Sequence, residues 1–307
     1  MLKIGIQTAG WFNKEDPLGS LTYIKECGFD AIDFNMDSYM STASLVTKGI
    51  YPTIFDLEIK ELFEYFAPLK EASEQTGVAI SQMHAPFPVY YKGYDEVNAH
   101  IMMALDKCFA VCEYLDCPAI VVHPTKAETK EEEWELNLRI YRSLIPVIQK
   151  YKGIKICLEN IFRRRAGRIE EGRFSDAADS CRMIDLLNEE AGGDYFGFCF
   201  DIGHANLTHR NVKKFVKALG PRLTILHIHD NNGMEDQHVL PYSCLSTAEE
   251  HVCDWQGFVE GLCEIGYNGV LAFETFRTMS TFPQAVRTEL LRLIAAIGRY
   301  WAGIIEK

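Results

Sequence analysis

Four stretches in the second half of the chain decide the fold: IKICLEN at residues 154–160, GFCFDIGH at 197–204, LTILHIHD at 223–230 and VLAFET at 270–275. Each is a short apolar run that leads directly into a carboxylate or an imidazole. Runs of this length, rich in β-branched and aromatic residues, are typical of buried strands. Each stretch therefore predicts a strand with a polar, metal-binding type of side chain at its end.

Similar runs recur along the whole chain of 307 residues. The eight predicted strands are residues 3–8, 31–35, 78–83, 119–123, 154–159, 195–201, 223–229 and 269–274. Longer stretches with helical periodicity separate them, such as 57–76, 95–115, 130–151 and 176–190. Eight β/α units in one chain favour an α/β fold of the single (β/α)8 TIM barrel type over an open doubly wound sheet.

The alternation of strands and helices runs from end to end without a linker rich in Pro, Gly or Ser. We therefore expect residues 1–307 to form one domain, and a hydrophobic content of 48% is sufficient for its core. The segments 35–56 and 231–254 are longer than a typical βα connection. They predict functional loops or short inserted helices over the barrel mouth.

Composition restricts the class of partner. The chain has 31 Lys and Arg against 43 Asp and Glu, and its net charge of -12 repels a nucleic-acid backbone. The 10 cysteines include no C-x-x-C pair and are interpreted as buried thiols in a reducing compartment. Neither a signal-peptide pattern nor an apolar run of membrane-spanning length is present. We expect a cytoplasmic protein without a nucleic-acid or membrane partner.

The ends of the predicted strands carry the chemistry. In a parallel barrel these ends meet at one mouth, where the βα loops begin. Six successive strands end in His84, His123, Glu159, Asp201, His227 and Glu274. Carboxylates gathered at the mouth would repel one another and lose hydration, and a divalent cation offsets both costs. The pattern therefore predicts a divalent-metal site.

Five motifs relate the chain to a known group of proteins. They are LEN at 158–160, FDIGH at 200–204, LHIHD at 226–230, DQH at 236–238 and the Glu-Thr pair at 274–275. With these motifs nearly the whole chain resembles the xylose isomerase-like TIM barrel superfamily. This group contains sugar phosphate isomerases and epimerases, inosose dehydratase-type proteins and endonuclease IV. The resemblance implies a metal-dependent isomerase or epimerase that acts on a small-molecule sugar or sugar phosphate.

The resemblance also implies a ligand set and an acid/base pair. One divalent metal would be held by Glu159, Asp201, His227 and Glu274, and the two glutamates would act as acid and base on opposite faces of the substrate. Three carboxylates and one imidazole favour Mn²⁺, and Mg²⁺, Co²⁺, Fe²⁺ and Zn²⁺ stay open. A cation on the substrate oxygens acidifies the carbon between them, so that nearby carboxylates can move its proton through an enediolate.

Further residues are predicted to bind the substrate. The resemblance assigns this role to His84, His123, His204, Asp236 and His238. Trp11 follows the first strand and is expected to form a wall of the sugar pocket, with Phe12, Phe87 and Tyr90 as further aromatic candidates. Arg164 lies in an arginine-rich loop after Glu159 and is expected to bind a substrate phosphate.

Three alternatives stay open at this stage. Endonuclease IV, an enzyme that cuts DNA at abasic sites, uses equivalents of His84, His123, His204, Asp236 and His238 in a three-zinc site. A dehydratase or other sugar lyase and a non-catalytic metal-binding barrel are the other two, and a homo-oligomer is also compatible with the sequence. The segment LPYSCLSTAEE at 240–250 departs from the glycine-rich pattern of the family, which weakens the roles assigned to Asp236 and His238.

Overall fold

The computed structural model describes residues 1–245 and 252–307, and eight parallel strands form its main sheet. The order of the strands is β10-β1-β2-β3-β4-β5-β8-β9. A parallel bridge between Ile228 and Phe273 joins the two ends of this order, so the sheet closes on itself. The predicted (β/α)8 barrel is confirmed.

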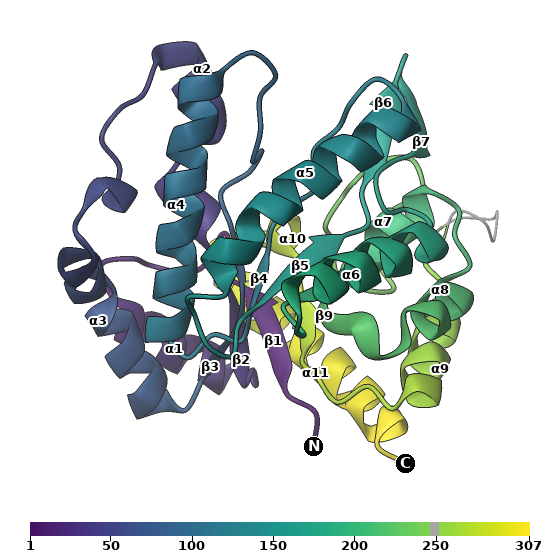
Figure 1. Ribbon diagram of the computed structural model, residues 1–307. Coiled ribbons are helices and arrows are strands. Elements are labelled where there is room, and N and C mark those ends of the chain that lie inside the picture. The colour runs from purple at the N-terminus through teal and green to yellow at the C-terminus, as the bar shows by residue number, and fades with distance from the viewer. Residues whose placement is uncertain (246–251) are drawn as a thin grey trace.

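Each predicted strand overlaps a strand of the barrel. The barrel strands are β1 (Ile4–Gln7), β2 (Ala31–Asn35), β3 (Ala79–His84), β4 (Ala119–Val121), β5 (Lys155–Glu159), β8 (Phe196–Asp201), β9 (Leu223–His227) and β10 (Leu271–Phe273). The α-helices are α1 (Pro17–Glu26), α2 (Thr42–Lys48), α3 (Ile59–Thr76), α4 (Asp95–Tyr114), α5 (Lys130–Ile148), α6 (Ala177–Ala191), α7 (Ile202–Leu207), α8 (Val212–Leu219), α9 (Trp255–Ile265), α10 (Phe276–Thr281) and α11 (Arg287–Ile305). In Figure 1 the helices surround the strands, and both termini lie at the lower end.

Local signals in the sequence set the helix ends. At the start of α5 the Thr129 side chain accepts a hydrogen bond from the Glu132 amide, and the Glu132 carboxylate accepts one from the Thr129 amide. This capping box satisfies two backbone donors that a helix start leaves unpaired. At the end of α3, Gly77 adopts a left-handed conformation with φ of 69°, which residues other than glycine rarely adopt. The predicted helices 57–76, 95–115, 130–151 and 176–190 agree with α3, α4, α5 and α6 to within three residues at each end.

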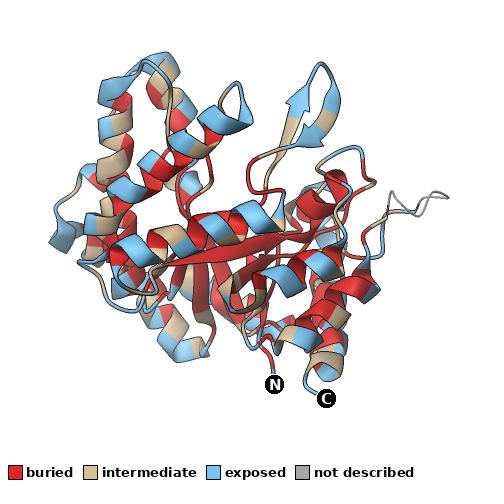
Figure 2. Cartoon of the chain, turned by 45° about the vertical axis from the view of Figure 1, so that its right-hand side comes forward, coloured by how far each residue is buried: buried red, intermediate tan, exposed pale blue. Residues whose placement is uncertain are grey.

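The core lies between the strands and the inner faces of the helices, which are buried, whereas the outer helix faces are exposed (Figure 2). Trp301 of α11 is fully buried, and its ring stacks at 5.8 Å on Phe273 and at 5.2 Å on Trp255. The prediction of buried thiols is confirmed for seven cysteines. It is wrong for Cys263, which is exposed, and for Cys181 and Cys244, which are half-buried because they lie at helix or loop surfaces.

The prediction is confirmed for the segment 35–56 and wrong for the segment that follows Glu159. The segment 35–56 contains α2 and the 3-10 turns η1 (Met36–Tyr39) and η2 (Ile54–Asp56), as expected. The segment after Glu159, predicted as a loop, instead forms an antiparallel hairpin of β6 (Phe162–Arg165) and β7 (Arg168–Glu171). Ala166 and Gly167 both have positive φ, which is the backbone geometry of a tight hairpin turn.

The second long segment, 231–254, includes residues 246–251, which lie outside the described residues. The altered family pattern at 240–250 therefore falls partly outside them as well. Among the described residues, no helix combines the length and the apolar character that crossing a membrane requires.

Candidate metal centre

His227 is the point on which the four predicted metal ligands converge. Its Nδ1 atom lies 3.4 Å from Oε2 of Glu274, 3.5 Å from Oε1 of Glu159 and 4.0 Å from Oδ2 of Asp201. These side chains stand at the ends of β5, β8, β9 and β10, and all four are buried. The parallel strands therefore bring together residues that are far apart in the sequence.

The arrangement fits a divalent ion. Neither ring nitrogen of His227 has a hydrogen-bond partner among the described residues, although both are buried. Buried polar atoms without a partner are rare and call for an explanation such as an ion. Two atoms that each bind one ion at about 2.1 Å lie at most about 4.2 Å apart. The separations between His227 Nδ1 and the three carboxylates meet this condition. One ligand atom from each of Asp201, His227 and Glu274 also lies within 4.8 Å of the other two, whereas Glu159 forms such a group with Asp201 and His204.

Asp33 of β2 orients this histidine, and the sequence prediction missed it. Its carboxylate accepts a hydrogen bond of 3.0 Å from Nε2 of Gln82, and it lies 2.9 Å from Nδ1 of His84 and 3.5 Å from Nε2 of His227. Burial opposes ionisation of Asp33, but the charges of the two histidines outweigh it and lower its pKa. Asp33 is therefore ionised, and Nδ1 of His227 faces the three carboxylates.

Glu274 is held by a second residue that the prediction missed, Gln7 of β1. Nε2 of Gln7 donates a hydrogen bond of 2.5 Å to Oε1 of Glu274. The backbone oxygen of Gln7 accepts a hydrogen bond of 2.7 Å from Nε1 of Trp11. Gln7 therefore links Trp11 to Glu274 through two hydrogen bonds. The predicted contact of Trp11 with a sugar stays a prediction.

His123 and Glu159 form a close pair, His123 just after strand β4 and Glu159 at the end of the neighbouring strand β5. Nε2 of His123 lies 2.9 Å from Oε2 of Glu159. Burial opposes ionisation of Glu159, but the charges of His123 and His227 hold its pKa well below the ordinary value. Glu159 is thus a carboxylate at neutral pH. His84 lies beside this pair, and its ring stacks on that of His227 at 4.4 Å.

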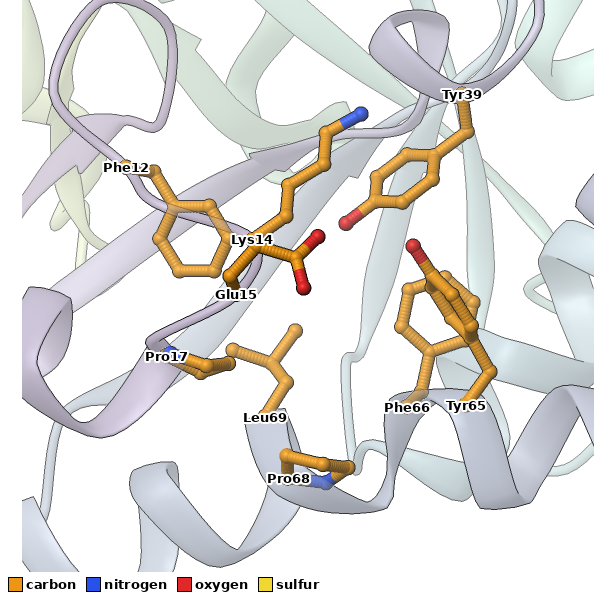
Figure 3. A pocket seen from close by; sticks show the side chains of 9 residues that line it. All are labelled: Phe12, Lys14, Glu15, Pro17, Tyr39, Tyr65, Phe66, Pro68 and Leu69. Carbon is orange, nitrogen blue, oxygen red and sulfur yellow. The ribbon is translucent and has the colours of Figure 1, made fainter.

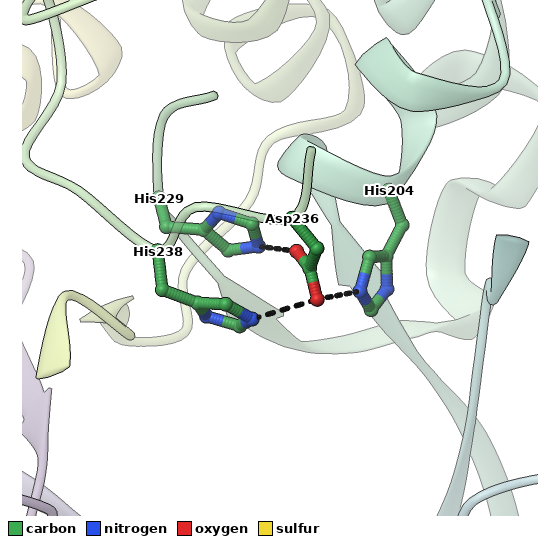
Figure 4. Close-up of side chains that lie close together, drawn as sticks. All are labelled: His204, His229, Asp236 and His238. Atoms are coloured by element: carbon green, nitrogen blue, oxygen red, sulfur yellow. Dashed lines mark hydrogen bonds and ion pairs between the residues drawn. The ribbon is translucent and has the colours of Figure 1, made fainter. Parts of the chain in front are cut away.

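Glu159, Asp201, His227 and Glu274 form the first cluster, and His204, His229, Asp236 and His238 form a second (Figure 4). The two lie side by side, because Nε2 of His229 is 3.1 Å from Asp201. Oδ2 of Asp236 lies 3.1 Å from Nε2 of His238 and 3.6 Å from Nε2 of His204, and Oδ1 lies 3.8 Å from Nε2 of His229. One nitrogen or oxygen from each of the four residues lies within 4.8 Å of the others. This cluster is therefore also capable of holding a metal ion.

An ion pair connects the two clusters. His229 lies 3.1 Å from Asp201 and connects the clusters, and burial opposes its protonation while Asp201 raises its pKa to about 9. Burial also opposes protonation of His204, and Asp201 and Asp236 raise its pKa well above the ordinary value. The negative charge of these carboxylates thus stabilises positive charge on the neighbouring imidazoles. A metal ion bound to the imidazoles would displace their protons, because protons and metal ions compete for the same ligands.

His229 was missed although the sequence contains a signal for it. It follows His227 by two residues in LHIHD, and side chains two residues apart in an extended strand share one face. Its imidazole stacks on that of His238 at 3.9 Å. His229 thus belongs to the site through the same periodicity that positions His227.

Two of the predicted aromatic and basic residues lie away from the clusters. Phe12 lines a separate pocket of about 210 Å³ formed with α3 residues such as Tyr65 and Leu69, outside the barrel (Figure 3). Arg164 lies exposed on the β6–β7 hairpin and lines a neighbouring cleft. Any phosphate that Arg164 binds would therefore lie in that cleft, and this contact stays a prediction.

Comparisons with known proteins agree on a family. A family model described as xylose isomerase-like TIM barrel matches residues 21–296. The uncharacterized protein MJ1311 of Methanocaldococcus jannaschii is 34% identical over 170 residues, and the match covers 52% of this chain and 51% of that protein. The inosose isomerase of Bacillus velezensis is 25% identical over 222 residues, and here the match covers 68% and 71%. The chain thus spans about half the length of the first relative.

Solved structures share the fold at lower identity. A D-tagatose 3-epimerase-like protein has a TM-score of 0.68 and 22% identity, with 97% of this chain and 99% of that chain covered. The IOLI protein, solved with a bound zinc atom, has a TM-score of 0.67 and 17% identity, with 99% and 98% covered. At these identities the similarity establishes a common architecture.

Proposed function

Because the chain belongs to the xylose isomerase-like TIM barrel family, we propose that it is a sugar isomerase or epimerase that depends on a divalent metal. The observation that carries the proposal is the convergence of Glu159, Asp201 and Glu274 on Nδ1 of His227. Several structural relatives are sugar epimerases, and one was solved with zinc. The preference for Mn²⁺ and a cytoplasmic location stay predictions.

The positions of Glu159 and Glu274 suit proton transfer on two faces of a substrate. They stand on β5 and β10, which are not neighbours in the barrel. A metal held by the four ligands would polarise the carbonyl and hydroxyl oxygens of a bound sugar. One glutamate would then remove the proton from the adjacent carbon, and the other would deliver a proton to the opposite face. His204 and His238 would donate hydrogen bonds to the sugar hydroxyls.

Solvent hydrogen exchange tests this proposal directly. The metal-loaded protein is incubated with ketoses and ketose phosphates in D₂O, and NMR follows deuterium incorporation next to the carbonyl. We expect exchange with at least one sugar, and a loss of about 10²–10⁴-fold in Glu159→Gln and Glu274→Gln. Glu170→Gln, on the exposed strand β7, is the matched control and should retain the wild-type rate. Wild-type rates in both site variants would contradict the assigned roles.

The second cluster supports one competing activity, that of an abasic-site endonuclease. His204, His229, Asp236 and His238 are able to hold a further ion. Three of them, His204, Asp236 and His238, are among the residues that the resemblance to a three-zinc endonuclease assigns to its site, together with His84 and His123. An enzyme of that kind would contain about three zinc ions and would cut abasic duplexes. A sugar lyase would instead release water, which mass spectrometry of the product detects.

A further inference from the structure

A cleft of about 980 Å³ opens beside the two clusters. The ring of Phe87, one of its lining residues, lies 4.6 Å from the ring of His123. The ring of Phe162, another, lies 5.2 Å from the ring of His204. The cleft therefore borders the candidate site, and the rings of Phe87 and Phe162 lie between the two. Its volume is at the upper end of the range of about 300–1,000 Å³ that ligand pockets occupy, so it has room for more than a single sugar ring.

Basic side chains without ion pairs line this cleft. They are Lys92, Lys126, Arg139, Arg164 and Arg165. In the described part of the chain no carboxylate forms an ion pair with any of them, and only Arg139 and Arg164 lie near an aromatic ring. Such a concentration of unpaired positive charge is notable in a chain with a net charge of -12. Unpaired cations in a concave surface raise the local concentration of anionic ligands.

Two further arginines of the cleft hold the hairpin in place. Arg163 and Arg173 reach the buried carboxylate of Glu133 on α5, at 2.5 Å and 3.8 Å. The hairpin is therefore fixed to α5 at its base, at the end of the barrel opposite the chain termini (Figure 1). Arg164 and Arg165 project from this fixed support, which lowers the entropic cost of ordering them around a ligand.

The acidic residues of the cleft do not cancel this charge. Glu128 and Glu132 line it as well. The Glu132 carboxylate is already bound to the Thr129 amide in the capping box of α5. These two carboxylates are outnumbered by the five basic side chains without ion pairs, so the cleft keeps a net positive charge.

We propose that this cleft binds the phosphate group of a phosphorylated sugar whose carbonyl end lies at the metal-ligand clusters. A phosphate monoester carries nearly two negative charges at neutral pH, and arginine binds it through paired hydrogen bonds. A nucleic-acid duplex fits less well, because its regularly spaced phosphates need positive charge spread along a surface. The inference rests on the proposed sugar-isomerising function and names the substrate class of the same site.

Binding is measured by calorimetry with ketopentose and ketohexose phosphates and with the same sugars without phosphate. The protein is the metal-loaded wild type. The Glu274→Gln variant, which is expected to lose its metal and not to turn over, measures binding to the cleft without the metal. We expect at least one phosphorylated sugar to bind about 10-fold or more tightly than its parent, with affinity that falls as salt rises. The double variant Arg164→Gln/Arg165→Gln should lose that preference and keep its affinity for the unphosphorylated sugar.

Arg168→Gln is the matched control, because Arg168 lies on the same hairpin but does not line the cleft. It should keep the wild-type preference. Equal affinity for phosphorylated and unphosphorylated sugars would overturn the inference, and so would tighter binding of sugar carboxylates or of an abasic duplex. Phosphate-dependent binding without turnover of any sugar would retain the cleft assignment and refute the proposed reaction, so the two failures are distinguishable.

Discussion

Replacing Asp33 by Asn tests how the structure prepares His227 for a metal. Asp33 is buried, and its carboxylate faces Nε2 of His227 at 3.5 Å and Nδ1 of His84 at 2.9 Å. The substitution keeps the size of the side chain and removes its charge. It therefore removes the negative charge that lies 3.5 Å from Nε2 of His227 and that favours the orientation in which Nδ1 faces Glu159, Asp201 and Glu274. We expect the fold to persist and the affinity for metal to fall.

The expected loss follows from the role of groups that hold metal ligands in place. Removing such a group costs about 10–100-fold in metal affinity, which is about 1.4–2.7 kcal/mol. At metal concentrations far above both dissociation constants, the stabilisation by metal falls by the same amount. For a chain of 307 residues, an unfolding entropy of about 2.1 cal/mol/K per residue makes 1 kcal/mol correspond to about 1.6 °C in Tm. The metal-induced rise in Tm should therefore shrink by about 2–4 °C.

The assay compares the Tm of metal-free and metal-loaded protein, with calorimetric titration of Mn²⁺ and Zn²⁺ as the direct measure of affinity. Asp30→Asn is the matched control, because Asp30 precedes the same strand at the other end of the barrel and pairs with Arg299 at 2.6 Å. It should lower both Tm values equally and leave the affinity unchanged. An unchanged affinity in Asp33→Asn would refute the orienting role of Asp33.

Two further predictions concern the support of the site. Glu133→Gln should destabilise the protein by about 3–5 kcal/mol in urea unfolding, because it leaves the buried guanidinium of Arg173 and that of Arg163 without a charged partner. It should also speed tryptic cleavage within the hairpin, and wild-type resistance would contradict the proposed attachment. Trp301→Ala should cost about 3–5 kcal/mol, because it empties the space between Phe273 and Trp255. A cost below about 1 kcal/mol would show that these rings do not depend on it.

The sequence predicted the fold, and the meeting of the strand-end residues at one mouth, because both depend on local patterns. The choice of four of these residues as metal ligands came from the family resemblance and stays a prediction. Each strand is recognisable from its own apolar run, and the parallel arrangement places all strand ends at one mouth. Glu159, Asp201, His227 and Glu274 stand at such ends, so their convergence follows once the strands are recognised. No knowledge of distant contacts was needed for this step.

The residues that the sequence missed owe their roles to contacts between distant strands. Asp33 and Gln7 lie on β2 and β1, and the importance of each comes from a partner more than 50 residues away. The β6–β7 hairpin was missed because its arginines have the composition of a solvated loop. The hairpin is stabilised in part by the ion pair between Arg163 and Glu133, and Glu133 lies on α5, before strand β5. Such pairings become visible only in three dimensions.

The metal content of the protein tests the central claim most directly. Elemental analysis of protein purified without chelators should find about one divalent metal per chain at the site of Glu159, Asp201, His227 and Glu274. The Glu274→Gln variant should have lost most of it under the same conditions. Protein that contains no metal and cannot be reloaded, or a variant that retains its full metal content, would contradict the account.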